Sequence, residues 1–169
     1  MAGAARVPRR QPPMRRLLIG VVGGSSCSSE EAEWAATVGR LLAEHGAVLL
    51  CGGLGGVMEA AARGAQQAGG LTVGMLPGAD PNEANPYIDV PLATGMGEMR
   101  NALIVRAAQA VIAIGGGWGT LSEIALAQRI QTPVVGLHDA FTSTIEIPRV
   151  PTPQAAVDWA VEQAGRREV

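Results

Sequence analysis

The stretch AVIAIGGGWGTLSE, from Ala110 to Glu123, decides the fold of this chain. Its first five residues are apolar and predict a buried strand, and the glycines after them predict a tight loop that leads directly into a helix. Such a loop leaves backbone N–H groups without partners in the helix. Because an anion can satisfy these groups, the stretch predicts a phosphate-binding loop.

The glycines of this loop each have a candidate role. Gly115, Gly116 and Gly117 allow positive φ and a close approach of a ligand to the backbone. Gly119 removes a side chain where the helix begins, and Thr120 either caps that helix or donates its hydroxyl to a phosphate.

Two larger side chains in the stretch each have two interpretations. Trp118 either stacks on a base or packs at a subunit interface. Glu123 is either a first-turn acid favoured by the helix dipole or a catalytic or ribose-binding carboxylate beside a bound phosphate.

Outward from this stretch, apolar runs alternate with segments of helical periodicity. Ser28 and Glu31 have the spacing of a capping box, which predicts the start of the first helix. Strands are expected at 17–22, 47–50, 71–75, 87–92, 110–114 and 132–137. Further helices are expected at 57–68, at 102–109, after the central glycine loop as far as Arg129, and from Pro153. This alternation predicts a single α/β domain with a Rossmann-like, doubly wound parallel sheet and helices on both faces. We expect the domain to span residues 15–169, after a disordered tail at 1–14.

The carboxyl ends of parallel strands meet at one edge of a sheet, so three glycine loops are expected to face one crevice. They contain Gly23, Gly24 and Ser25 after the first strand, Gly52 and Gly53 after the second, and Gly115. Three such loops predict a nucleotide or another phosphorylated small molecule as the ligand. They form no clean G-x-G-x-x-G, and the acidic residue that binds ribose is missing, which disfavours NAD and FAD.

Composition excludes several classes of protein. All 13 basic residues are arginines, so the chain lacks the lysine that pyridoxal-phosphate enzymes and P-loop NTPases require. The net charge of −2 disfavours a nucleic-acid-binding surface, and no apolar run is long enough to span a membrane. Cys27 and Cys51 are expected to bind no metal and to indicate a reducing compartment, so we expect a cytoplasmic protein.

The segment GMGEMRNALIVRAAQAVIAIGGGWGTLSEIALA, Gly95 to Ala127, resembles the signature region of the LOG (Lonely Guy) family, long labelled lysine decarboxylases. The usual family motif is P-G-G-x-G-T-x-x-E, and here glycine replaces the proline at position 115. Arg100 is retained from the family's Arg-Lys pair, whereas Asn101 replaces the lysine. These departures, with the segment Cys51 to Gly70, are closer to a bacterial branch that is similar to molybdenum-cofactor carrier proteins.

The resemblance implies a phosphate seat at the N–H groups of residues 116–120, with Arg100 and Glu123 as the catalytic pair and no metal. The implied reaction is hydrolysis of the N-glycosidic bond of a nucleoside 5′-monophosphate to base and ribose 5-phosphate. Glu123 would stabilise positive charge on the ribose or orient water, and Arg100 would hold Glu123 ionised or bind the phosphate.

Loss of the family's lysine leaves a second interpretation open. The same loops would serve a non-catalytic carrier of the molybdenum cofactor, or a sensor of an AMP-like nucleotide, equally well. Ser26, Glu59 and Glu98 are weaker candidates for the site. Relatives are dimers or higher oligomers, so a homodimer is expected.

Overall fold

The computed structural model describes residues 15–138 and 145–167, so the tail expected at 1–14 lies outside the described residues. The elements are β1 (Leu18–Gly23), α1 (Ser29–Glu44), β2 (Val48–Cys51), α2 (Val57–Gln67), β3 (Thr72–Leu76), η1 (Pro81–Glu83), β4 (Val90–Ala93), η2 (Gly97–Arg100), α3 (Asn101–Ala107), β5 (Ala110–Ile114), α4 (Trp118–Ile130), β6 (Val134–Leu137), β7 (Arg149–Val150) and α5 (Pro153–Arg166).

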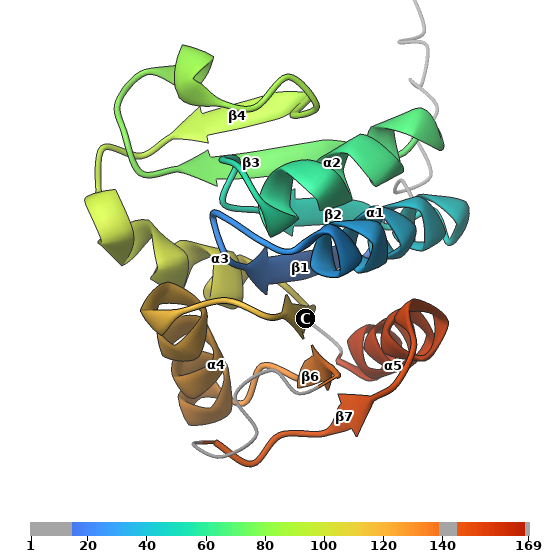
Figure 1. Cartoon of the computed structure of the whole chain (residues 1–169). Coiled ribbons are helices and arrows are strands. Elements are labelled where there is room, and N and C mark those ends of the chain that lie inside the picture. The colour runs from blue at the N-terminus through green and yellow to red at the C-terminus, as the bar shows by residue number, and fades with distance from the viewer. Residues whose placement is uncertain (1–14, 139–144, 168–169) are drawn as a thin grey trace, which may run out of the picture.

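The strands form one seven-stranded sheet in the order β4-β3-β2-β1-β5-β6-β7, and every neighbouring pair is parallel (Figure 1). The chain starts in the middle at β1, builds outward to β4, and then crosses back to β5 on the other side of β1. This confirms the predicted doubly wound α/β fold. The change of direction lies between β1 and β5, where ligands bind in sheets of this kind.

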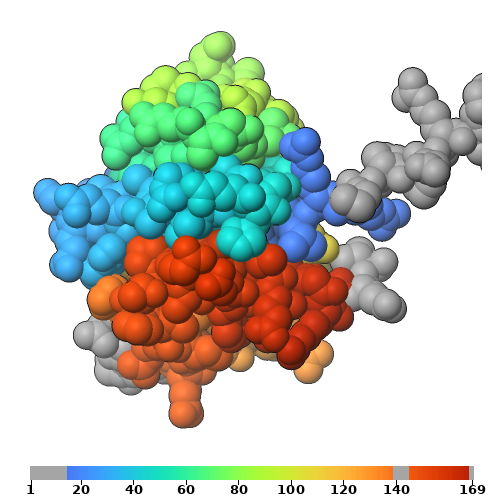
Figure 2. All heavy atoms as spheres, turned by 90° about the vertical axis from the view of Figure 1, so that its right-hand side faces the viewer, coloured from blue at the N-terminus to red at the C-terminus, as the bar shows by residue number. Residues whose placement is uncertain are grey.

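Alternate residues of the central strands enter two separate cores, one on each face of the sheet. Ile112 and Ile114 of β5 pack with α1, α2 and α5, whereas Val111 and Ala113 pack with α3 and α4. Figure 2 shows the first face, on which α5, in red, lies below α1, in blue to cyan. Burial on both faces explains why all five residues of β5 are apolar.

Close approach of α1 and α2 depends on two glycines. A Cβ atom at Gly39 would overlap the carbonyl oxygen of Ala61, and one at Gly64 would overlap that of Ala36. These two helices can therefore pack at a distance that larger residues would prevent. Their contact holds the loops after β1 and β2 side by side.

The structure corrects several element boundaries. The strand expected at 87–92 is shorter and forms the exposed edge strand β4, and β7 was not expected because two residues give no periodic pattern. A 3₁₀ turn, η2, precedes α3 and contains Arg100. No helix in the described part of the chain is both long and apolar enough to cross a membrane.

Candidate functional site

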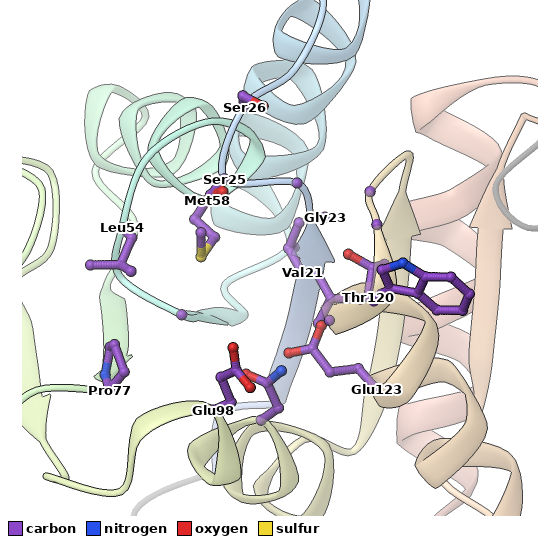
Figure 3. A pocket seen from close by; sticks show the side chains of 18 of the residues that line it. Val21, Gly23, Ser25, Ser26, Leu54, Met58, Pro77, Glu98, Thr120 and Glu123 are labelled. Atoms are coloured by element: carbon purple, nitrogen blue, oxygen red, sulfur yellow. The ribbon is translucent and has the colours of Figure 1, made fainter.

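A cleft of about 610 Å³ lies at the carboxyl edge of the sheet, beside the β1–β5 switch point. The loops after β1, β2 and β5 all contribute to it, together with η2 and the start of α3 (Figure 3). Eleven of the thirteen residues predicted for the site line this cleft: Gly23, Gly24, Ser25, Gly52, Arg100, Gly116, Gly117, Trp118, Gly119, Thr120 and Glu123.

Gly53 and Gly115 do not line the cleft, although both lie in the expected loops. Gly53 has a φ of 76° and packs against Leu76 and Gly74. Gly115 has a φ of 53°, and a Cβ atom there would overlap Oε1 of Glu31. The positive φ of both residues favours glycine at these positions, so both serve the backbone path of their loops.

The amino terminus of α4 opens into the cleft without a cap. Gly117 is the N-cap residue and has no side chain to accept a hydrogen bond from the first turn. The first N–H groups of an α-helix have no partner within the helix. Together with the positive end of the helix dipole, they form a site suited to an anion.

Thr120 and Glu123 lie further from the start of α4 than expected from the sequence, because α4 already begins at Trp118. Thr120 is in the first turn but does not cap α4; its side chain packs against Gly116, and the residue is only 3% exposed. Glu123 lies in the second turn, so the interpretation as a first-turn acid is wrong. The structure places it in the wall of the cleft instead.

Arg100 is buried beneath the cleft, with 8% of the residue exposed. Its Nη2 donates a hydrogen bond to the carbonyl oxygen of Gly52 at 3.3 Å, and its Nη1 donates to Oδ1 of Asn101. Its Nε has no hydrogen-bond partner. Arg100 therefore ties η2 to the loop after β2 and retains one buried donor that protein groups leave unsatisfied.

Glu123 is 6% exposed and forms no hydrogen bond or ion pair with the described residues, Arg100 included. Burial raises the pKa of Glu123 to about 7, and the positive charge of Arg100 opposes that rise without cancelling it. The carboxyl group can therefore lose or gain a proton near neutral pH. Desolvation likewise lowers the pKa of Arg100, an effect that Glu123 opposes.

Cys51 lies at the end of β2, close enough to Arg100 and Glu123 to feel both charges. Burial raises the pKa of its thiol to about 11, so it is neutral at physiological pH. Among the described residues, no group of three or more His, Cys, Asp or Glu side chains is placed to hold a metal ion. Cys51 is thus a packing residue in this structure.

Part of the wall opposite α4 consists of residues that were not predicted from the sequence. Leu54, Met58 and Pro77 supply apolar surface there, and Glu31 also faces the cleft although its carboxylate completes the capping box with Ser28. Leu54 lies in the loop after β2, and Pro77 follows the last residue of β3. Because the loops after parallel strands share one edge of the sheet, both residues could have been predicted from the sequence. Of the weaker candidates, Ser26 and Glu98 line the cleft, whereas Glu59 does not.

The chain is similar to known proteins over most of its length. The model of the SLOG cluster4 family matches residues 16–163. An uncharacterized protein of Archaeoglobus fulgidus is 43% identical over 152 residues, which cover 89% of this chain and 99% of that protein.

Two solved structures are similar over nearly their whole length. The molybdenum cofactor binding protein from the phototrophic bacterium Rippkaea orientalis is 36% identical with a TM-score of 0.81, covering 88% of this chain and 98% of that one. The molybdenum cofactor carrier protein of Chlamydomonas reinhardtii is 32% identical with a TM-score of 0.79, covering 90% of this chain and 100% of that one. The resemblance inferred from the glycine and arginine motifs is therefore confirmed.

Proposed function

Because this chain belongs to the SLOG cluster4 family, we propose that it binds a phosphorylated, pterin-type molybdenum cofactor as its cargo, without converting it chemically. The observation that supports this most directly is the uncapped amino terminus of α4, which opens into a cleft of about 610 Å³. The similarity to two molybdenum cofactor proteins over nearly the whole chain supports the same ligand.

The described residues fit the phosphate of such a ligand. The N–H groups of residues 117–120 supply donors at the start of α4, and Ser25 and Ser26 add exposed hydroxyl groups from the loop after β1. The guanidinium of Arg100 adds a positive charge beneath the same cleft, and its Nε is buried without a partner. These donors and this charge would hold a phosphate without a lysine.

Asn101 supports a binding role over turnover. Its Oδ1 accepts a hydrogen bond from Arg100, which leaves its amide N–H₂ group available to the cleft that it lines. A neutral donor thus stands where the LOG motif has a lysine. The site loses one positive charge, but it retains enough hydrogen bonds to hold an anion.

Glu123 supports the second candidate function, hydrolysis of a nucleoside 5′-monophosphate to its base and ribose 5-phosphate. A carboxyl group with a pKa of about 7 in the wall of a ligand cleft can transfer a proton at neutral pH. Against this, Arg100 forms no direct ion pair with Glu123 and donates instead to Gly52 and Asn101. We therefore rank hydrolysis below binding.

A thermal-shift screen with base release measured in the same wells separates these functions. The ligands are AMP, GMP, CMP, ribose 5-phosphate and a pterin phosphate, because binding to the folded state raises the melting temperature whether or not chemistry follows. Stabilisation without release of base supports the carrier or sensor. Release of base that Glu123→Ala abolishes would establish the hydrolase, and absence of any shift would contradict both.

The assembly and location of the protein belong to the same proposal. We propose a homodimer at least, and a cytoplasmic location consistent with a small-molecule partner rather than nucleic acid or membrane. Several large apolar side chains are exposed near the β4 edge: Leu71, Val90, Leu92, Met96 and Met99. A second copy of the chain would cover them.

A further inference from the structure

Two carboxyl groups meet in the part of the cleft below the loop after β1. Glu98 comes from η2 and Glu123 from the second turn of α4, and Figure 3 shows their side chains pointing toward one another in the cavity. Neither carboxyl group accepts a hydrogen bond or forms an ion pair with any described residue. Glu123 is only 6% exposed, and a buried acceptor of this kind normally has a partner, whereas Glu98 is an exposed acceptor on the same cleft.

Arg100, the last residue of η2, forms no ion pair with either carboxyl group. Its two terminal nitrogens are directed to Gly52 and Asn101, and its buried Nε has no partner. The cleft is therefore lined by two kinds of polar group. The uncapped start of α4 offers donors and suits an anion, whereas the carboxyl groups of Glu98 and Glu123 offer acceptors.

The cleft also has an apolar wall. Leu54 follows β2, Met58 lies in the first turn of α2, and Pro77 follows β3. Figure 3 shows Leu54 and Pro77 on the side of the cleft opposite Thr120 and Glu123. Such a wall can contact the face of a flat heterocycle whose edge meets the carboxyl groups.

We propose that Glu98, with Glu123 beside it, recognises the N–H edge of a 2-amino-4-oxopyrimidine ring, the ring shared by pterins and guanine. This inference rests on the proposed function, since it places the phosphate of the ligand at α4 and the ring toward η2. A carboxylate can accept two parallel hydrogen bonds, one from the ring N–H and one from the neighbouring amino group. Glu98 lines the cleft and is exposed, so both oxygens of its carboxyl group are accessible to a ligand.

The same geometry excludes adenine as a preferred ring. At the corresponding edge, adenine presents an unprotonated ring nitrogen beside its amino group, so one lone pair would face the carboxylate. Hypoxanthine retains the ring N–H but lacks the 2-amino group. A site of this kind therefore discriminates among rings by the pattern of donors and acceptors on the ring edge.

Binding of GMP, IMP, AMP and ribose 5-phosphate to the purified protein, measured by calorimetry, tests the inference. GMP and IMP differ only in the 2-amino group. Because IMP lacks one charge-assisted hydrogen bond, its affinity is expected to be lower than that of GMP by about tenfold or more. AMP is expected to bind more weakly than IMP. Ribose 5-phosphate reports the anion seat alone.

The matched variants are Glu98→Gln and Glu33→Gln, which remove the same charge at two places. Glu98→Gln is expected to bring the ratio of the affinities for GMP and IMP near one. It is expected to leave the affinity for ribose 5-phosphate unchanged. Glu33 lies exposed on α1 and does not line the cleft, so Glu33→Gln is expected to keep the wild-type ratio.

The outcomes separate this inference from the proposed function. Equal binding of GMP and IMP by the wild type, a ratio that survives Glu98→Gln, or binding of ribose 5-phosphate without GMP would each overturn the ring assignment alone. Failure of every phosphorylated probe to bind would overturn the anion seat, and the ring assignment with it.

Discussion

Glu123 shows how one buried side chain links the site to the stability of the protein. Burial raises its pKa from the ordinary value of 4.5 to about 7, so the folded protein holds this proton more tightly than the unfolded chain does. Between these two pH values the folded state binds more protons, and the free energy of unfolding therefore falls as pH rises. Above about pH 7 both states are ionised, and this contribution no longer changes.

We predict that Glu123→Gln flattens this part of the stability profile. The full pKa difference corresponds to roughly 3 kcal/mol, an upper value because ionisation draws water toward the carboxylate. Urea unfolding at pH 5 and pH 8 should show a smaller loss of stability for Glu123→Gln than for the wild type. Glu33→Gln is the control, and an equal loss in all three proteins would contradict the assignment.

Gly115 shows why a family motif can change without loss of the loop. The LOG motif usually has proline at this position, but proline requires a φ near −65°, whereas Gly115 has a φ of 53°. Glu31 occupies the space where a Cβ atom would lie. The capping box of α1 and the glycine loop after β5 are therefore packed against one another, and glycine at position 115 meets both the φ and the space that this packing requires.

At the scale of elements, the helix termini divide into those closed by protein and those left open. Ser28 caps α1 through a capping box, and Thr152 caps α5 by accepting a hydrogen bond from the N–H of Ala155 at 3.2 Å. Gly56, Arg100 and Gly117 precede α2, α3 and α4 without a side-chain cap. All three helices start beside the cleft, where open N–H groups can serve an anion.

We predict that Gly117→Ser stabilises the free protein but weakens its binding of phosphorylated ligands. Gly117 has a φ of −126°, and a Cβ atom there would meet nothing within 4 Å, so serine fits the site. Its hydroxyl would accept from the N–H groups that the ligand otherwise uses, and a serine N-cap is worth a few tenths of a kcal/mol, roughly, over glycine. The measurements are urea unfolding and calorimetric titration with ribose 5-phosphate.

Thr152→Ala is the matched control for this experiment. It removes an existing cap from α5, far from the cleft-lining residues, and is expected to cost about 1 kcal/mol of stability while binding stays unchanged. If Gly117→Ser bound ribose 5-phosphate as tightly as the wild type, the N–H groups of α4 would not be the anion seat.

At the scale of the whole molecule, the order of strands decides both where the cleft lies and which surface stays exposed. The switch point between β1 and β5 brings the first and third glycine loops together, although more than eighty residues separate them in the chain. The same strand order leaves β4 at the edge of the sheet, where Val90 and Leu92 are 39% and 43% exposed. An apolar edge of this kind invites pairing with another chain.

We predict that the protein sediments as a dimer or larger oligomer and that the β4 edge contributes to the interface. Leu92→Lys places a charge on that edge and is expected to shift the protein toward monomer, because burying an unpaired charge is unfavourable. Gln67→Lys, on the exposed surface of α2, is the control. Sedimentation velocity over a range of concentrations measures both, and a wild type that is monomeric throughout would contradict the prediction.

Local patterns in the sequence were sufficient for most of the elements. The apolar run of β5, the Ser28 capping box and the start of α5 at Pro153 are found where they were expected, because strand burial, capping and the fixed φ of proline act within a few residues. The glycine loops and their common edge follow from the alternation of strands and helices. Short or exposed strands such as β4 and β7 lack such a pattern, and their bounds depend on their partners.

The sequence by itself determined the doubly wound fold, the edge of the sheet that bears the site, and most of the residues of the cleft. Only the tertiary structure decided that Arg100 donates to Gly52 and Asn101 instead of pairing with Glu123, and that Gly53 and Gly115 do not line the cleft. It also placed Glu98 opposite Glu123 and raised the pKa of the latter. These features depend on burial and on contacts between residues far apart in the chain, and no local pattern of residues encodes either one.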